Sequence, residues 1–345
     1  MKFIFPAGIS YASVLGGRTV QLARVLATTH EVHLVEIPSW RRPRFFPARR
    51  STDRLTVHSL PPCWGNSWFP MMAKYLRRQI GTGDAVAVVS HPFWQPLMAA
   101  LPETTLVYDC LDYVAIHCPD AGSYLDELVV REKRLIQAAR HIFAVSAPLA
   151  ERLGVPEKCV LLPNAVPESW LRQPFCPSGD PVLGFHGALY EWLDYRLLEE
   201  VADAFPACTL RLVGPVRHPQ TVVGLARRRN VELLPQCEFD ALPPVIGNFT
   251  IGLIPFRCDE VARCADPLKT YEYLSLGKPV LTTVPPVKPN PAVKYASAET
   301  FIVELRQLLA AAPSAAACRD SVRHDTWTDR VQNLVKVISG GTSDA

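Results

Sequence analysis

The residues that decide the fold read Asp266-Pro-Leu-Lys269-Thr270-Tyr-Glu272-Tyr-Leu-Ser-Leu-Gly277-Lys-Pro279. An Asp followed by Pro predicts a helix start, because Asp is a favoured N-cap and Pro fits the first turn. Gly277 and Pro279 predict the helix end. Residues three apart share a helix face, which places Lys269 and Glu272 together with Asp266. Such a face is either a solvated ion pair or, at the tips of strands, part of a binding site.

Short apolar runs alternate with helical patterns on both sides of this stretch. The predicted strands cover residues 2–7, 31–37, 54–60, 85–90, 105–110, 141–146, 158–163, 182–189, 209–214, 231–235, 249–256 and 279–284. The predicted helices cover residues 17–28, 68–80, 124–140, 147–153, 193–205, 219–229, 242–247, 267–276, 298–311 and 326–339. Such alternation is typical of parallel sheets wrapped by helices. We therefore expect an α/β protein with two Rossmann-like, doubly wound domains facing each other across a cleft.

A proline-rich segment separates the two halves. Residues 163–181 contain five prolines and show little periodicity, which is typical of a linker. A chain of 345 residues also suits two domains better than one. We predict an N-terminal domain over residues 1–165, a linker over 166–181, a C-terminal domain over 182–325, and a C-terminal helix over 326–345 that packs back on the N-terminal domain. The linker is expected to be part of a hinge.

The composition excludes several classes of protein. No run of 18 apolar residues is present, so no membrane span is expected. The N-terminus lacks the features of a signal peptide. The ten cysteines form no C-x-x-C pair and have no accompanying His cluster, which favours reduced structural thiols and no metal site. We expect a cytoplasmic protein that can lie on the inner face of the cell membrane.

Positive charge is concentrated in the first half. Residues 1–163 carry eighteen Lys and Arg against thirteen Asp and Glu, and nine of those basic residues lie within residues 41–78 among several aromatic side chains. Basic residues mixed with aromatics suit an anionic membrane surface or a lipid-linked acceptor. The candidate basic patch comprises Arg41, Arg42, Arg44, Arg49, Arg50, Trp68, Lys74, Arg77 and Arg78. A solvated loop that binds nothing is the alternative, and nucleic acid is not an expected partner.

Two further candidates lie at predicted strand ends in the first half. Gly16 and Gly17 follow the first strand and precede a helix, where paired glycines let the backbone approach a ligand; a tight turn is the alternative, and no G-x-G-x-x-G fingerprint supports a dinucleotide. Asp109 and Asp112 end a strongly apolar strand, and a carboxylate there suits a general base or a loop hydrogen bond. His91 ends a neighbouring strand and is either catalytic or structural.

Four segments of the sequence resemble the bacterial GT-B glycosyltransferases, particularly the large retaining family 4 group that makes surface polysaccharides. They are the Gly16-Gly17 loop, LLPNAVP (161–167), GFHGALYEWLDYRLL (184–198) and the segment 266–281. The resemblance implies that Glu272 binds the nucleotide ribose and that Lys269 lies near the phosphates. It also assigns Gly187, Gly214, Asp266 and Thr270 to the donor site.

The sequence departs from this pattern at one position. Retaining members usually have a second Glu eight residues before the ribose Glu, and here Cys264 stands there. Asp259, Glu260 or Asp266 are the candidate substitutes. The segment 107–113 instead resembles the inverting, xanthan-type glucuronosyltransferases, in which an Asp at the Asp112 position is the base. The resemblance therefore leaves open whether the enzyme retains or inverts the anomeric configuration.

The expected function is transfer of a hexosyl group from a UDP- or GDP-sugar to a hydroxyl of a saccharide acceptor, lipid-linked, in surface polysaccharide synthesis. The expected catalytic residues are Asp112 and His91. No cofactor and no metal are expected, because helix N-termini and basic side chains neutralise the leaving diphosphate in this fold. Two alternatives stay open: a nucleotide-sugar epimerase with the same architecture, and a non-catalytic partner subunit.

Overall fold

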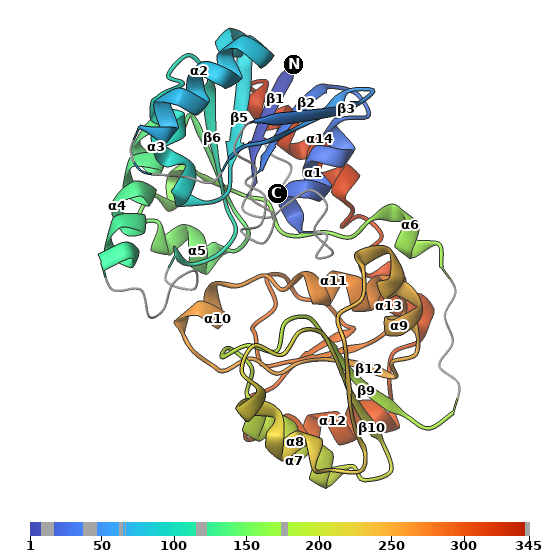
Figure 1. Ribbon diagram of the computed structural model, residues 1–345. Helices are drawn as coiled ribbons and strands as arrows, with labels where there is room; N and C mark the ends of the chain where they lie inside the picture. Colours follow the sequence, from blue (N-terminus) through green and yellow to red (C-terminus); the bar gives the residue numbers. More distant parts are fainter. Residues whose placement is uncertain are drawn as a thin grey trace. The chain divides into compact units, whose positions relative to one another are not determined.

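The computed structural model describes residues 1–7, 17–36, 47–61, 65, 67–114, 123–173 and 179–341. The chain divides into two compact units, one made of Met1–Pro163 with Arg330–Ala345 and the other of Asn164–Asp329. Each unit contains one sheet with helices on both of its faces (Figure 1). Within the described ranges, no helix is long and apolar enough to cross a membrane.

The first unit is built on an eight-stranded sheet in the order β3-β4-β2-β1-β5-β6-β7-β8. Its strands are β1 (Lys2–Pro6), β2 (Glu31–Glu36), β3 (Ala48–Thr52), β4 (Leu55–Ser59), β5 (Ala85–Val89), β6 (Thr105–Cys110), β7 (His141–Ala144) and β8 (Cys159–Leu161). Neighbouring strands are parallel except β3 and β4, which are antiparallel. The direction of winding changes between β1 and β5. Ligands of such sheets bind beyond the strand ends at this point.

Helices cover both faces of the first sheet. They are α1 (Arg18–Leu26), α2 (Trp68–Ile80), α3 (Gln95–Ala99), α4 (Ser123–Ala138), α5 (Ala147–Arg152) and α14 (Trp327–Ile338), with 3-10 turns η1 (Thr82–Asp84), η2 (Pro92–Trp94) and η4 (Pro156–Lys158). Figure 1 shows α2, α3 and α4 on one side and α1 and α14 on the other. This cover explains why β5 is apolar and buried at every position. In α14, Val331, Leu334 and Val337 recur every three residues and are buried.

The second unit is built on a six-stranded parallel sheet in the order β11-β10-β9-β12-β13-β14. Its strands are β9 (Val182–His186), β10 (Thr209–Val213), β11 (Val231–Leu234), β12 (Ile251–Ile254), β13 (Val280–Thr282) and β14 (Val293–Tyr295). Its helices are α6 (Glu168–Leu171), α7 (Tyr195–Ala204), α8 (Val223–Ala226), α9 (Leu242–Gly247), α10 (Glu260–Cys264), α11 (Leu268–Ser275), α12 (Phe301–Ala310) and α13 (Ala315–Asp320), with 3-10 turns η5 (Pro219–Val222) and η6 (Phe239–Ala241). The winding changes direction between β9 and β12.

Alternate side chains of the second sheet enter two separate cores. Leu183 and Phe185 of β9 pack in the core formed with α7, α8 and α12. Val182 of the same strand packs in the core formed with α6, α9, α11 and α13. The two groups of helices lie on opposite sides of the strands (Figure 1). This arrangement follows from the two-residue period of a strand, and it fixes α11 against the sheet beside the switch point.

Hydrogen bonds hold the chain on each side of the unit boundary. The Pro163 carbonyl accepts hydrogen bonds from Arg18 Nη1 at 3.1 Å and from Arg330 Nε at 2.9 Å, all in the first unit. In the second unit, the Asn164 N–H donates to Asp266 Oδ2 at 2.6 Å, and Asn164 Nδ2 donates to the Asp266 carbonyl at 2.6 Å. The boundary thus falls within a single peptide group, whose carbonyl is bonded to side chains of the first unit and whose N–H is bonded to a side chain of the second.

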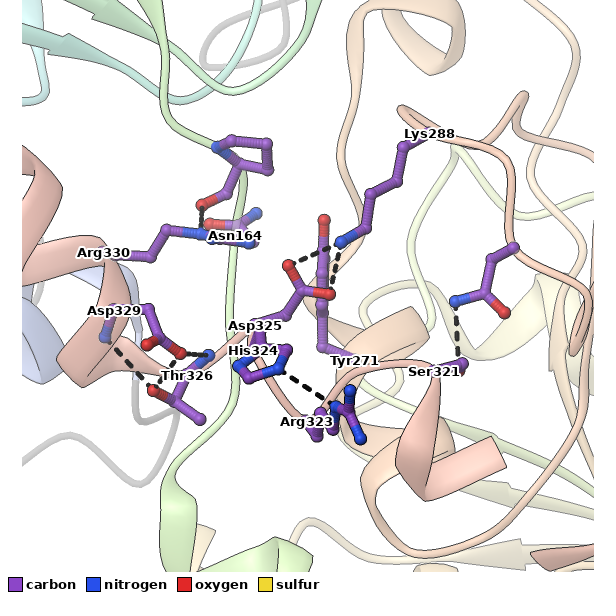
Figure 2. Close-up of polar contacts among 12 residues, drawn as sticks. Asn164, Tyr271, Lys288, Ser321, Arg323, His324, Asp325, Thr326, Asp329 and Arg330 are labelled. Carbon is purple, nitrogen blue, oxygen red and sulfur yellow. Dashed lines mark hydrogen bonds and ion pairs between the residues drawn. The ribbon is translucent and has the colours of Figure 1, made fainter. Parts of the chain in front are cut away.

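Helix α14 begins with a reciprocal cap formed by Thr326 and Asp329. The Asp329 N–H donates to Thr326 Oγ1 at 3.2 Å, and the Thr326 N–H donates to Asp329 Oδ2 at 3.0 Å (Figure 2). These two bonds satisfy backbone donors that a helix start leaves open. Just before it, Asp325 accepts from Lys288 Nζ at 2.7 and 2.5 Å (Figure 2). The Thr326–Asp329 cap is therefore the local reason why a helix starts at Trp327.

The observed elements differ from the predicted ones at the edges of the sheets. β3 and β14 were not predicted, because ARRST is polar and exposed and VKY is only three residues long. The predicted linker over residues 166–181 also differs, since Val166 and Trp170 are buried in a core of the second unit. The boundary lies between Pro163 and Asn164, two residues before the predicted one.

Candidate functional site

Lys269 of α11 lies over the end of β9. A Cβ atom added to Gly187 would approach Lys269 Cε to 2.7 Å and Nζ to 2.9 Å. Gly187 also has a φ of +126°, which few residues other than glycine adopt. The ammonium lies 5.3 Å from the ring centroid of Phe185 and 5.7 Å from that of Phe256. The structure therefore places Lys269 at the carboxyl edge of the second sheet.

Gly187 and Gly214 bring two loops together at this edge. A Cβ atom at Gly214, whose φ is +149°, would lie 2.0 Å from the Gly187 carbonyl oxygen. The Gly187 N–H donates to the Val213 carbonyl at 2.8 Å. Only glycine at position 214 allows the two backbones to approach this closely. Of the six residues predicted to bind the donor, Gly187, Gly214, Lys269 and Glu272 lie just after β9 and β10 or on α11.

Glu272 is buried next to His186, the last residue of β9. The carboxylate is 6% exposed, and its Oε2 lies 2.9 Å from His186 Nε2. The following helix residue, Tyr273, accepts a hydrogen bond at its hydroxyl from the His186 N–H at 3.0 Å. A Cβ on Gly252 of β12 would lie 2.2 Å from the Tyr273 ring, so glycine is required there. His186 was not singled out from the sequence, although it directly precedes Gly187 within the quoted GFHG run.

Asp266 and Thr270 lie on a different side of this segment. Because α11 begins at Leu268, helical spacing does not extend to Asp266, and the predicted Asp266 N-cap is wrong: Pro267 is the N-cap residue. The Asp266 carboxylate instead accepts hydrogen bonds from the Asn164 N–H and the Tyr271 hydroxyl. Thr270 lines a small internal cavity together with Asp266 and Tyr271. This correction removes Asp266 from the face of Lys269 and Glu272.

The position of Cys264 is buried, and the three candidate substitutes differ in their surroundings. Asp259 caps α10 by accepting a hydrogen bond at Oδ1 from the Ala262 N–H at 2.8 Å. Asp266 accepts hydrogen bonds from the Asn164 N–H and the Tyr271 hydroxyl, as described above. Glu260 is exposed in the first turn of α10. The three carboxylates therefore differ in burial, since Asp259 and Glu260 are exposed and Asp266 is buried.

In the first unit, the two acids at the end of β6 have different environments. Asp109 is 1% exposed and forms a two-point ion pair with buried Arg18, at 3.0 Å from Nε and 2.8 Å from Nη2. Asp112 is half-buried beyond the strand end. Beside it, the Arg152 guanidinium lies 3.5 Å above the Tyr113 ring. The Arg18–Asp109 pair therefore holds α1 to β6, and Asp112 is a second, less buried acid just beyond the end of that strand.

His91 lies just after the carboxyl end of β5, and Gly17 lies at the start of α1. The His91 Nδ1 accepts a hydrogen bond from the Phe93 N–H at 3.0 Å and caps η2, so this nitrogen has a structural role. The preceding residue, Ser90, shares a 3.0 Å hydroxyl contact with Thr19 of α1. Gly17 is the N-cap of α1 with a φ of −60°, a value open to any residue. Gly16 lies outside the described residues.

The described residues of the predicted basic patch have different surroundings. Trp68 is 2% exposed and donates its indole N–H to the Pro61 carbonyl, which corrects its assignment to the patch. Arg77 forms two hydrogen bonds with Glu103 and lowers the pKa of that carboxyl to about 2. Arg49 donates to Gln79 and Arg50 to Glu36. Lys74 and Arg78 are exposed, one helical turn apart on α2. Arg41, Arg42 and Arg44 lie outside the described residues.

The described side chains contain no group of three or more His, Cys, Asp or Glu that could hold a metal ion. The described cysteines are free thiols, and burial raises the pKa of several of them, including Cys110 and Cys318. Their environment is that of small apolar side chains.

No protein-family model matches the sequence. A curated relative, the putative teichuronic acid biosynthesis glycosyltransferase TuaH of Bacillus subtilis strain 168, is 27% identical over 209 residues, which are 54% of this chain and 53% of that protein. The chain thus matches about half the length of this relative.

Solved structures resemble the chain over nearly its whole length. Sucrose-phosphate synthase of Thermosynechococcus elongatus has a TM-score of 0.68 at 14% identity, with 96% of this chain and 94% of that chain covered. An E. coli trehalose-6-phosphate structure bound with UDP-2-fluoro glucose has a TM-score of 0.70 at 9% identity, covering 99% and 100%. The trehalose 6-phosphate synthase of Burkholderia multivorans has a TM-score of 0.69 at 11% identity, covering 98% of both chains. The chain has the GT-B fold, which confirms the predicted α/β class with two Rossmann-like domains.

Proposed function

We propose that the protein is a glycosyltransferase that moves a hexosyl group from a UDP- or GDP-sugar to a hydroxyl of a saccharide acceptor. The sequence likeness to TuaH, which is named as a putative teichuronic acid biosynthesis glycosyltransferase, supports surface polysaccharide synthesis as the setting. The proposed acceptor is a lipid-linked saccharide. Two structural neighbours support a nucleotide-sugar donor: the E. coli structure is bound with UDP-2-fluoro glucose, and a trehalose-phosphate synthase of Burkholderia vietnamiensis is named as UDP-forming. The fold by itself does not specify chemistry, so the proposal depends on the site.

One observation carries the proposal: Lys269 and Glu272 lie on one face of α11, beside the glycines that end β9 and β10. In the transfer, an acceptor oxygen bonds to the anomeric carbon while the bond from that carbon to the phosphate oxygen breaks. The electron pair leaves with the nucleoside diphosphate. The Lys269 ammonium and the positive N-terminus of α11 would stabilise this developing charge, and Glu272 would accept hydrogen bonds from the ribose. Gly187 and Gly214 let the diphosphate approach the backbone.

In the first unit, Asp112 is the proposed catalytic acid-base residue. Its neighbour Asp109 is already neutralised by Arg18, whereas Asp112 lies half-buried beyond the strand. A carboxylate in that place can take the proton of the acceptor hydroxyl during an inverting transfer. In a retaining transfer, Glu260 would instead take the part of the missing Glu at position 264. The anomeric configuration of the product, measured by NMR, separates the two.

The proposed membrane-facing surface is smaller than the predicted basic patch and is confined to α2. Met71, Lys74 and Arg78 share the exposed side of α2, and Met71 is 55% exposed. An exposed apolar side chain flanked by two cations suits the surface of an anionic bilayer. We therefore propose that the protein acts at the cytoplasmic face of the membrane through this side of α2.

The test is transfer of radiolabelled sugar from UDP- and GDP-sugars into a lipid fraction. Lys269→Ala and Glu272→Ala should abolish transfer, while Lys294→Ala, a change at a lysine of β14 that pairs with Glu304, should not. A thermal-shift screen with nucleoside diphosphates identifies the base, since a ligand at 100 times its Kd adds about 2.7 kcal/mol. Nucleotide release without transfer would point to an epimerase, and unchanged activity in both variants would point to a non-catalytic subunit.

A further inference from the structure

The imidazole of His186 and the carboxylate of Glu272 form a buried pair at the end of β9. His186 is 7% exposed and Glu272 6% exposed, and the atoms Nε2 and Oε2 lie 2.9 Å apart. Although the distance is short, Nε2 lacks an aligned hydrogen bond within the described part of the chain. Buried polar atoms are nearly always hydrogen-bonded, so such an atom requires an explanation. One explanation is that Nε2 completes its hydrogen bond when a ligand binds next to Glu272.

The position of His186 is fixed by the same helix that carries Glu272. The His186 N–H donates to the Tyr273 hydroxyl at 3.0 Å, and the two rings meet edge to face with centroids 5.3 Å apart. Tyr273 in turn is fully buried against Gly252. Tyr273 thus contacts the backbone N–H and the ring of His186, and the neighbouring Glu272 contacts its imidazole nitrogen Nε2. This leaves the imidazole little freedom to move away from the carboxylate.

We infer that His186 is a positioning residue for Glu272, and this inference rests on the proposed function. The imidazole holds Oε2, so that the carboxylate presents Oε1 to the ribose hydroxyls of the nucleoside diphosphate. Within the described residues, His186 is the one side chain recorded in contact with this carboxylate. Without His186, the carboxylate stays in place but loses its defined orientation. The ribose selectivity of the site then falls, while its affinity for the diphosphate does not.

The experiment compares two probes, a nucleoside diphosphate and its 2′,3′-dideoxy analogue, by isothermal titration calorimetry on the full chain. UDP and GDP are both tried on the unmodified protein, and the one that binds is used. His186→Phe keeps the ring volume and removes the polar atom. We expect it to weaken binding of the ribonucleotide about tenfold and of the dideoxy analogue less than twofold, since a hydrogen bond to a charged group is lost only in the first case.

Two further variants separate positioning from packing. His186→Gln can place an amide N–H near the position of Nε2, so it should restore most of the ribonucleotide affinity. In a Glu272→Gln background, His186→Phe should have little further effect, because coupled residues are not additive. His141→Phe is the matched control. His141 is a half-buried histidine of the first unit whose Nε2 also has no hydrogen-bond partner in the described structure, and its replacement should change neither affinity.

Each other outcome overturns a different statement. If His186→Phe binds the ribonucleotide as well as the unmodified protein does, or loses both probes equally, or if His186→Gln behaves like His186→Phe, then His186 does not position Glu272. If the unmodified protein binds neither UDP nor GDP, or does not distinguish ribose from dideoxyribose, then the proposed donor site itself fails, and this inference fails with it. That result is visible before any variant is made. Circular dichroism of each variant confirms that it is folded.

Discussion

The side chain of Lys269 occupies the space that any side chain at Gly187 would need, with Cε only 2.7 Å from the position of an added Cβ. Lysine and glycine lie on different elements, the lysine on α11 and the glycine just after β9. The close approach therefore depends on the absence of a side chain at position 187. It ties the backbone that ends β9 to the cation that we assign to the donor phosphates.

Replacing Gly187 should therefore damage the donor site directly. In Gly187→Ala, the new methyl group displaces the Lys269 ammonium, and we expect nucleoside diphosphate affinity to fall more than tenfold in calorimetry. Gly179→Ala is the matched control: its φ is +92°, but a Cβ there meets nothing within 4 Å. Gly179→Ala should lower the free energy of unfolding, because alanine is strained at a positive φ, but it should not change the affinity for the nucleoside diphosphate. Equal losses in both variants would mean that backbone strain, not Lys269, explains the effect.

Asp112→Asn should lower the rate of transfer without changing donor affinity. A positioned acid-base group contributes about 100-fold or more to the rate, and the amide cannot take a proton. The turnover number should therefore fall by about that factor, while the Kd for the nucleotide stays within twofold. Asp84→Asn, the same change at an exposed residue of the first unit, is the control. Turnover retained in Asp112→Asn would exclude Asp112 as the base.

Breaking the ion pair between Arg18 and Asp109 should destabilise the first unit. Removing one partner of a buried pair leaves the other charge without compensation, which typically costs about 3–5 kcal/mol. Arg18→Ala should lower the midpoint of urea unfolding accordingly, and Asp109→Asn should act in the same direction. Arg196→Ala breaks the exposed pair with Glu200 and should cost less than about 0.5 kcal/mol. If Arg18→Ala and Arg196→Ala lowered the free energy of unfolding equally, the buried ion pair would contribute no more to stability than the exposed one.

Stability should fall in mild acid because of a buried histidine pair. His58 lies 3.0 Å from His33, and burial, then the nearby His33, lowers the pKa of His58 to about 4. Burial also lowers the pKa of His33. The unfolded chain takes up the His58 proton near pH 6.5 and the folded chain only near pH 4. Stability is therefore full above pH 6.5 and declines between pH 6.5 and 4, by up to about 3 kcal/mol for His58.

The measurement is hydrogen exchange of the peptides that contain β2 and β4, followed from pH 7.5 to 4.5 and corrected for intrinsic rates. His58→Gln removes one titrating group and should flatten the decline. An unchanged slope would mean that other groups cause the acid sensitivity. His324→Gln, at an exposed position of the second unit, is the control and should leave the slope unaltered.

Binding to anionic vesicles should depend on Lys74 and Arg78. Each basic residue near such a surface contributes about 1 kcal/mol, or roughly fivefold in affinity. Replacing both with Glu should therefore lower binding to phosphatidylglycerol vesicles at least 25-fold at low salt. Lys158→Glu makes the same type of charge change at another exposed residue of the first unit and should have a smaller effect. Equal effects would indicate a general charge attraction without a specific surface.

Local patterns in the sequence predicted the helix that carries the proposed donor-site residues. The predicted bounds 267–276 lie within one residue of each end of α11, and the three-residue spacing placed Lys269 and Glu272 on one face of it. β6 was predicted with its observed bounds, because its apolar run is continuous. Predictions failed where the pattern was short or polar, as in β3. They also failed where a residue sits just outside a helix, since the periodicity that grouped Asp266 with Lys269 applies only within it.

The class of fold, the division into two domains and the helix that carries Lys269 and Glu272 could be predicted from residue order alone, because periodicity, caps and glycines act over a few residues. Which distant residues become partners depends on the folded structure. Arg18 meets Asp109 from 91 positions away, and Asn164 meets Asp266 from 102. His186 and Glu272 likewise come together only when α11 packs against β9. The physical reason is that such pairs depend on how strands are ordered in the sheet, and no local propensity encodes that order.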